Sequence, residues 1–288
     1  MQSTVQAESA GSRISVRKLS EPLGAEIAGI DLSQPLTEST IAAVQRAFAE
    51  HLVLVFRGLD LTPGQQVAFT RLFGPVEPHP LGSRRTADGH PEVLVFENKP
   101  GTPGARNDFW HTDISFAEQP PALSLLHARR ITEGVGDTLF SNMCAAYDEL
   151  SPGFKRLLDG LRAVHTSAPL MRRNNEGRSD GRPIAEVPPP VEHPVIRTHT
   201  VTGRKAVYVN PYFTSHFAGM TPDESRPILE YLYARATRPE NVYRHQWKRG
   251  DVLMWDNRAT MHYAIYDYDE TMPRLMHRTT AGHEKPYH

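Results

Sequence analysis

Short apolar runs, each closed by glycine, proline or a polar turn, follow one another along most of this chain and constrain its fold more than any other feature. Runs of strand length occur at 14–19, 25–30, 52–56, 93–96, 123–128, 138–141, 195–200, 205–210, 242–247, 251–255 and 275–280. Apolar residues at helical spacing predict helices at 37–51, 62–73, 145–150, 152–161 and 222–236. Many short strands with a few helices are typical of packed β-sheets. The sequence therefore predicts an α+β fold with a mainly β core, a jelly roll with peripheral helices.

The length and composition favour a single domain. With 288 residues, of which 39 % are hydrophobic, the chain can bury one large core. Residues 1–12 are small and polar and predict a flexible N-terminal tail, so the expected domain spans 13–288. Between 166 and 190 the apolar periodicity disappears. A loop of this length is either a lid over a site or a disordered insertion, and we take a lid loop as the prediction.

The charge and cysteine content argue against several classes of protein. A formal net charge of -1 gives no global field that would attract nucleic acid or an anionic membrane. The one cysteine, Cys144, excludes an internal disulfide framework and a C-x-x-C motif, which suits a reducing compartment. The first residues lack an apolar core, and no run approaches the ~18 apolar residues of a membrane span. We expect a cytoplasmic protein without nucleic-acid or membrane partners.

One tripeptide offers metal ligands. In an extended segment His111 and Asp113 lie on the same face, and Thr112 points the other way. An imidazole and a carboxylate are two of the three ligands in the facial 2-His-1-carboxylate site of non-haem Fe(II) proteins. H-x-D is a common tripeptide, so a third ligand from elsewhere in the chain has to support this interpretation.

A second group of candidate residues lies near the C-terminus. His262 follows a predicted strand, and Arg274 and Arg278 are four residues apart, which places them on one face of the last predicted strand. Two guanidinium groups inside a barrel need anions, and their planar forks suit carboxylate, sulfonate or phosphate groups. The alternative is that both arginines form surface ion pairs with Asp267, Asp269 or Glu270.

Taken together, four segments resemble the taurine dioxygenase family of Fe(II)- and 2-oxoglutarate-dependent oxygenases. They are Trp110–Asp113, Gly136–Thr138, Trp255–Arg258 with His262, and Arg274–Arg278. The resemblance keeps the same order from about residue 14 to about residue 286. It implies a double-stranded β-helix, which agrees with the strand-rich pattern, and members that assemble as homodimers or homotetramers.

The resemblance also implies a role for each cofactor residue. His111, Asp113 and His262 would bind Fe(II), and Thr138 with Arg274 would hold the distal carboxylate of 2-oxoglutarate. The other end of 2-oxoglutarate would chelate the metal and leave one position for O2. The reaction would release succinate and CO2 and hydroxylate a substrate carbon.

For the substrate, the resemblance implies that Arg278 binds an anion, helped by His79 and Asn107, with Phe213 as an apolar wall. We expect a small organic anion, a sulfonate such as taurine, whose hydroxylated product decomposes to sulfite and an aldehyde. An alkyl sulfate or an aryloxyalkanoate remains open, because a guanidinium binds sulfate or carboxylate equally well.

The match weakens at Gly82, where the taurine enzymes have a tyrosine that faces the substrate, and at Pro169 and Leu170, where a serine and an aromatic residue are expected. These differences predict a roomier or less polar pocket than taurine requires.

Two hypotheses from other classes also remain open: a non-catalytic, cupin-like metal-binding protein, and a zinc hydrolase with a His, Asp, His site.

Overall fold

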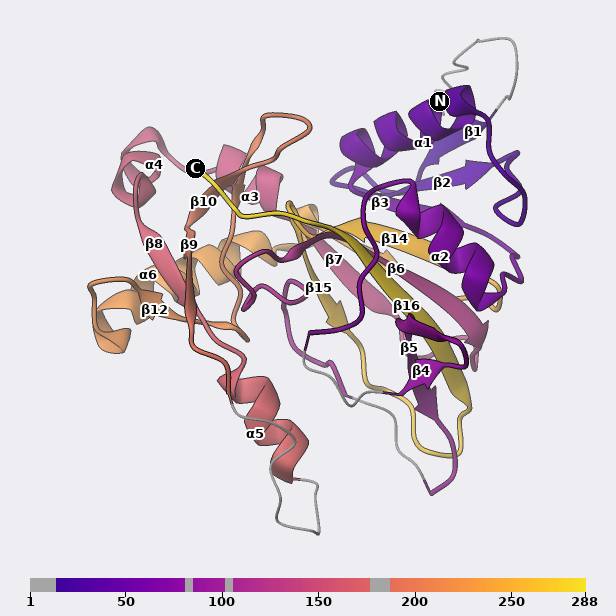
Figure 1. Ribbon diagram of the computed structural model, residues 1–288. Coiled ribbons are helices and arrows are strands. Elements are labelled where there is room, and N and C mark those ends of the chain that lie inside the picture. Colours follow the sequence, from indigo (N-terminus) through magenta and orange to yellow (C-terminus); the bar gives the residue numbers. More distant parts are fainter. Residues whose placement is uncertain (1–13, 81–84, 102–105, 177–186) are drawn as a thin grey trace.

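Two sheets packed face to face form the centre of the molecule, whose computed structural model describes residues 14–80, 85–101, 106–176 and 187–288 (Figure 1). In these residues the larger sheet has eight strands. Their order is β1 (Ser15–Lys18), β2 (Ala25–Ala28), β3 (Val53–Phe56), β14 (Val252–Asp256), β6 (Pro121–Arg130), β16 (Arg274–His283), β5 (His90–Asn98) and β4 (Thr86–Ala87). Neighbouring strands are antiparallel except for β2 and β3.

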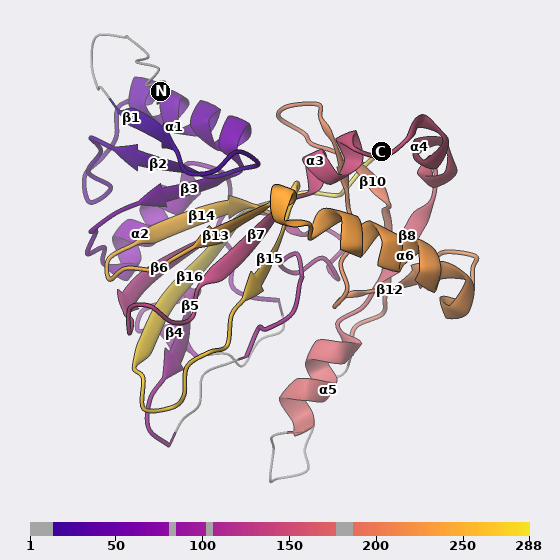
Figure 2. The same ribbon diagram turned by 180° about the vertical axis from the view of Figure 1, so that it is seen from behind.

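The smaller sheet covers one face of the larger one. It consists of β13 (Val242–His245), β7 (Thr138–Asn142) and β15 (Thr260–Ala264), all antiparallel (Figure 2). Phe140 and Met261 of this sheet share a buried core with Trp255 and Met276 of the larger sheet. The arrangement confirms the predicted jelly roll, with most strands at their predicted positions.

Strand β3 shows why the predicted strands are continuous apolar runs. Successive side chains of a strand point to opposite faces, and both faces of this strand are covered. Val53 and Val55 belong to the core between the sheets, whereas Leu54 and Phe56 pack in a second core on the outer face. A polar residue at any of these positions would be buried, since all four are at most 1 % exposed.

Helices α1 (Glu38–His51) and α2 (Pro63–Arg71) cover the outer face of the larger sheet. Thr37 caps α1 by accepting a hydrogen bond from the backbone N–H of Thr40. Thr62 and Gln65 form a reciprocal capping box at the start of α2. Both helix starts lie where the sequence predicted them.

A third layer flanks the jelly roll and carries the remaining elements (Figure 1). Its strands are β8 (Arg162–His165), β9 (Val191–Pro194), β12 (Thr214–Phe217), β10 (Ile196–Thr198) and β11 (Lys205–Val207). Its helices are α3 (Met143–Asp148), α4 (Pro152–Leu158), α5 (Ala168–Glu176), α6 (Pro222–Ala236) and the 3-10 turn η1 (Pro239–Asn241). Strands β10 and β11 form the predicted hairpin, and α6 extends from α3 to β12 (Figure 2).

The prediction of a loop from 166 to 190 is partly wrong, because residues 168–176 form helix α5. Ala168, Leu170 and Met171 are good helix formers, but they form one short apolar run followed by five polar residues, so no apolar repeat marks the helix in the sequence. Residues 177–186 and the predicted tail at 1–12 lie outside the described part of the chain. The single domain from 13 to 288 stays a prediction. Within the described residues, no helix is both long enough and apolar enough to span a membrane.

Candidate active site

His111, Asp113 and His262 converge at one point between the sheets. All three are buried, and their ligand atoms lie within 4.8 Å of one another. His111 pairs with His262 on β15 through two backbone hydrogen bonds, of 3.0 and 2.8 Å between N and O. The expected extended segment is shorter than predicted, because the chain enters a turn at Asp113 and Ile114 has a φ of 54°. The two side chains nevertheless lie close together, with 3.7 Å between His111 Nε2 and Asp113 Oδ1.

The donor set fits a divalent transition metal. His111 Nδ1 lies 2.9 Å from the carbonyl oxygen of Phe109. This hydrogen bond needs the proton on Nδ1. Nε2 then has a free lone pair on the side where Asp113 lies, as in histidines that bind a metal. Burial lowers the pKa of His111 and holds that of His262 well below its usual value, so both imidazoles are neutral near pH 7. Two neutral imidazoles and one carboxylate match the facial triad.

Asp113 is the charged member of this group. Burial by itself would raise its pKa, but the positive charge of Arg278, the two histidines and the hydroxyl of Ser124 lower it below the usual value. Arg278 Nη1 lies 2.9 Å from Asp113 Oδ1, and Ser124 Oγ donates to Oδ2 over 2.6 Å. The carboxylate is therefore ionised and has both oxygen atoms occupied by protein donors.

A cavity beside the two histidines contains both residues expected to bind 2-oxoglutarate, Thr138 at the start of β7 and Arg274 at the start of β16. Trp247 Nε1 donates to Thr138 Oγ1 over 3.0 Å, which leaves the proton of the threonine hydroxyl available to a ligand. Gly136 has a φ of +69°, and a Cβ at this position would collide with the guanidinium of Arg274. The positive φ favours glycine here, and a Cβ would displace the guanidinium of Arg274.

Arg274 does not form the surface ion pairs that were the alternative interpretation. Its guanidinium lies over the rings of Tyr268 and Trp247, at 5.3 and 6.0 Å from their centres. Among the described residues no carboxylate lies within ion-pair distance of it, and Asp267 instead accepts a hydrogen bond from the backbone of Gly136. A half-buried guanidinium that lies over two aromatic rings and lines the cavity suits a bound carboxylate.

Trp255 belongs to the candidate site, although the sequence suggested no role for it beyond its place in the Trp255–Arg258 segment. Trp255 is 2 % exposed, lines the same cavity, and its indole Nε1 has no hydrogen-bond partner in the part of the chain that the structure describes. Its position directly before Asp256 gave no signal, because a tryptophan at a strand end is usually a core residue. Together with Phe140 it surrounds His262, at 4.9 and 5.9 Å between ring centres.

A second pocket shares His111 and Arg278 with this cavity and contains all four residues expected to bind substrate: His79, Asn107, Phe213 and Arg278. Apolar side chains make up most of the remaining wall, namely Phe96, Phe109, Ile114, Phe116 and Leu170. Leu170 is contributed by helix α5, so part of the expected lid loop does line the pocket. The position of Gly82 lies outside the described residues.

Comparison with known proteins agrees with this geometry. Residues 15–280 match the family model described as taurine catabolism dioxygenase TauD, TfdA family. An alkylsulfatase of Acinetobacter baylyi is 35 % identical over 277 residues, which cover 94 % of this chain and 86 % of the relative. The alpha-ketoglutarate-dependent 2,4-dichlorophenoxyacetate dioxygenase of Cupriavidus pinatubonensis is 35 % identical over 272 residues, or 89 % of this chain and 93 % of the relative.

Among solved structures, a taurine dioxygenase from Burkholderia xenovorans superposes with a TM-score of 0.80 at 37 % identity, covering 95 % of this chain and 90 % of that one. The match extends over the sheets and over the third layer. It sets aside the alternatives of a non-catalytic binding protein and of a zinc hydrolase. The chain belongs to the TauD/TfdA family and is an alpha-ketoglutarate-dependent dioxygenase.

Proposed function

We propose that this enzyme uses Fe(II) and 2-oxoglutarate to hydroxylate an organic sulfur oxyanion with an apolar chain, an alkyl sulfate in preference to taurine. The observation that carries the proposal is the composition of the substrate pocket, in which one guanidinium, that of Arg278, faces a wall of aromatic and aliphatic side chains. The relative named as an alkylsulfatase supports the same substrate class.

The metal would be held by His111, Asp113 and His262. When bound, Fe(II) would couple two reactions: the oxidative decarboxylation of 2-oxoglutarate by O2, and the insertion of one oxygen atom into a substrate C–H bond. The protein contributes the neutral histidines, the ionised carboxylate and a dry surrounding formed by Phe140 and Trp255.

The cosubstrate would be oriented by Arg274 and Thr138. The guanidinium can form two parallel hydrogen bonds with the distal carboxylate, and the threonine hydroxyl can donate a third. Trp247 fixes the threonine by donating to its oxygen. These contacts would place the 2-oxo acid end toward the metal ligands.

The substrate would be oriented by Arg278. One of its nitrogens contacts Asp113, whereas Nε has no partner in the described residues, and the guanidinium lies 5.2 Å from the ring centre of Phe96. A planar guanidinium has five N–H donors, so it can serve Asp113 and a sulfate group together. The apolar chain would then extend along Phe213, Phe116 and Leu170.

Hydroxylation of the carbon that bears the sulfate ester gives an unstable product, which breaks its C–O bond to release sulfate and an aldehyde. The same step on a sulfonate breaks the C–S bond and releases sulfite and an aldehyde. In both cases one oxygen atom of O2 enters the substrate and the other enters succinate.

The test compares hexyl sulfate, hexanesulfonate and taurine with purified enzyme, Fe(II) and 2-oxoglutarate. We expect O2-dependent succinate formation with both C6 substrates and sulfate release from hexyl sulfate. The kcat/KM for taurine should be at least tenfold lower than that for hexyl sulfate. Equal turnover of taurine would overturn the preference for an apolar chain. Absence of succinate formation with every anion would overturn the proposal of a small sulfur oxyanion.

A second candidate substrate is an aryloxyalkanoate. The aromatic residues Phe96, Phe109, Phe116 and Phe213 in the pocket wall and the 2,4-dichlorophenoxyacetate dioxygenase relative favour it. Including 2,4-dichlorophenoxyacetate in the panel decides between the two, since its turnover releases a phenol and no sulfate. Assembly as a dimer or tetramer and a cytoplasmic location stay predictions.

A further inference from the structure

The two carboxylate oxygens of Asp113 have different surroundings. Oδ1 faces the metal centre, 3.7 Å from His111 Nε2 and 2.9 Å from Arg278 Nη1. Oδ2 accepts a hydrogen bond from Ser124 Oγ over 2.6 Å. Because the ligand has to present one oxygen to the metal, whatever holds Oδ2 also sets the direction of Oδ1.

Ser124 is itself held by Asn257. Asn257 Nδ2 lies 2.9 Å from Ser124 Oγ, and both residues are at most 1 % exposed. A carboxylate only accepts, so the single proton of Ser124 has to point toward Asp113, and the serine oxygen is left to accept from the amide of Asn257. The chain of donors therefore runs in one direction, from Asn257 through Ser124 to Asp113.

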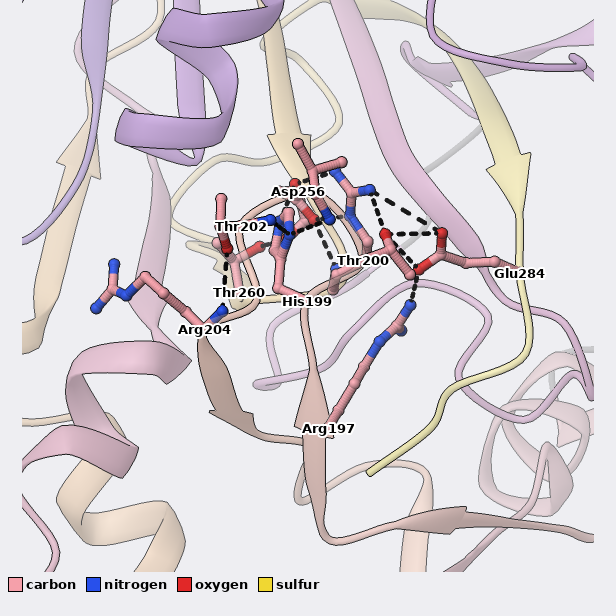
Figure 3. Close-up of polar contacts among 10 residues, drawn as sticks. Arg197, His199, Thr200, Thr202, Arg204, Asp256, Thr260 and Glu284 are labelled. Carbon is pink, nitrogen blue, oxygen red and sulfur yellow. Dashed lines mark hydrogen bonds and ion pairs between the residues drawn. The ribbon is translucent and has the colours of Figure 1, made fainter.

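Asn257 occupies a segment that is fixed by buried charges on both sides. The carboxylate of Asp256 accepts from His199 Nε2 over 2.9 Å and from Arg258 Nε and Nη2 over 2.9 and 2.6 Å (Figure 3). Arg258 Nη1 also donates to Thr200 Oγ1 over 2.9 Å. Burial would raise the pKa of Asp256, but Arg258 and His199 lower it, so the cluster keeps its charge. These contacts restrict the backbone around Asn257.

A second connection joins the same segment to the metal ligands. Thr260 Oγ1 donates to the carbonyl of Asp256 over 2.7 Å, and Thr112 Oγ1 donates to the carbonyl of Thr260 over 3.0 Å. Thr112 stands between the ligands His111 and Asp113, and Thr260 stands two residues before His262. The segment from Asp256 to Thr260 therefore contacts Asp113 through Ser124, and holds Thr112, the residue between the proposed ligands His111 and Asp113.

We propose that Ser124 and Asn257 are positioning residues of the metal centre, which direct Asp113 Oδ1 to the metal by holding Oδ2, and that the Asp256–Arg258 cluster anchors them. The inference rests on the proposed metal centre. Without the serine hydroxyl the carboxylate can turn, and both of its oxygens become available to Arg278. Outer hydrogen-bond partners of this kind typically contribute about 10- to 100-fold to metal affinity.

The experiment measures Mn(II) and anaerobic Fe(II) binding to the metal-free enzyme, with thermal unfolding recorded on the same samples. Ser124→Ala is expected to weaken metal binding at least tenfold and Asn257→Ala severalfold. The double variant is expected to bind as weakly as Ser124→Ala alone, because Asn257 acts through the serine.

Ser141→Ala is the matched control. Ser141 is also fully buried, and its Oγ donates over 2.6 Å, but to the carbonyl of Ala236 rather than to a metal ligand. It is expected to lose stability as Ser124→Ala does and to bind metal like the wild type. This separates a positioning role from a general loss of packing.

The outcomes are distinguishable. If the wild type binds neither ion, the proposed metal centre fails. If the wild type binds and Ser124→Ala binds as tightly as Ser141→Ala, the positioning role is overturned. Should Ser124→Ala not fold, Asn257→Ala alone decides, because it keeps the serine: unchanged metal binding in that variant overturns the inference.

Discussion

The proposed cosubstrate end and the proposed substrate end of the candidate active site are built from different kinds of structure. Thr138, Trp255 and Arg274 stand on paired strands of the two sheets. His79, Asn107 and Phe213 stand on loops and turns, and Leu170 stands on the short helix α5. Strand positions are fixed by the hydrogen-bond ladder, whereas loops vary without disturbing the fold. This difference in structure explains how one family can keep its cosubstrate and change its substrate.

The two ends also differ in chemistry. The cosubstrate end presents a few separate polar groups, and Trp247 holds one of them, Thr138, by donating to its hydroxyl oxygen. The substrate end is an aromatic surface: Phe109 stacks on Tyr212 at 3.5 Å between ring centres, and Phe116 contacts Phe213 at 4.9 Å. We therefore expect substitutions at the cosubstrate end to lower the activity with every substrate to the same extent. Substitutions at the substrate end should lower the activity with some substrates more than with others.

Arg274→Ala is the strongest test of this difference. The variant is expected to lose about 100-fold in kcat/KM for 2-oxoglutarate, because truncating one partner of a buried charged pair removes roughly 3 kcal/mol. The loss should be the same with hexyl sulfate and with 2,4-dichlorophenoxyacetate, as measured by succinate formation. Arg204→Ala, which removes an exposed ion pair with Asp148, serves as the control. A loss that depends on the substrate would break the comparison.

Lowering the pH tests whether the jelly roll and the third layer, which contributes Leu170 and Phe213 to the substrate pocket, unfold together. His127 on β6 and His193 on β9 are both buried, and burial lowers the pKa of each to about 4. Between about pH 6.5 and pH 4 the unfolded chain therefore binds protons that the folded protein does not, so stability is present above this range and is lost as the pH falls.

The free energy of unfolding of the wild type falls between pH 7 and pH 5. We expect this fall to be about 2 kcal/mol smaller in His127→Gln and in His193→Gln. Chemical denaturation at the two pH values measures this. Equal effects indicate one cooperative unit. An effect for His193→Gln alone would show that the third layer unfolds first.

Leu170→Ala tests the apolar wall. Removing a side chain that contacts an alkyl chain is expected to lower kcat/KM for hexyl sulfate roughly tenfold, since burial of a leucine contributes about 1.5–3 kcal/mol. The KM for 2-oxoglutarate and the turnover of taurine should not change. If all three parameters fall together, Leu170 supports the fold and not the choice of substrate.

Arg173 gives the smallest expected effect. Its Nη2 lies 3.2 Å from Asp108 Oδ1 and its guanidinium lies over the ring of Phe109, so it attaches helix α5 to the segment that precedes the proposed ligands His111 and Asp113. Because Arg173 is partly exposed, the ion pair contributes at most about 1 kcal/mol. Arg173→Ala should raise the KM for hexyl sulfate severalfold, and the exposed neighbour Arg172→Ala should not.

Much of the fold follows from local patterns. The caps at Thr37 and Thr62, the alternating burial of β3 and the hairpin of β10 and β11 could be predicted, because each depends on residues close in sequence. Helix α5 and strands β8, β9 and β12 were missed. Their signals are short or irregular, and they are stabilised by packing in the third layer.

The sequence by itself determined the reaction class through the resemblance of four segments to a known family, whereas spacing and residue type only limited which ions and anions the candidate residues could bind. Only the tertiary structure decided that Arg274 lies between aromatic rings while Arg278 pairs with Asp113, although both stand on one strand. It alone brought Ser124 and Asn257 to Asp113. Such contacts join segments far apart in the chain, and their formation depends on how the sheets pack, which no local pattern records.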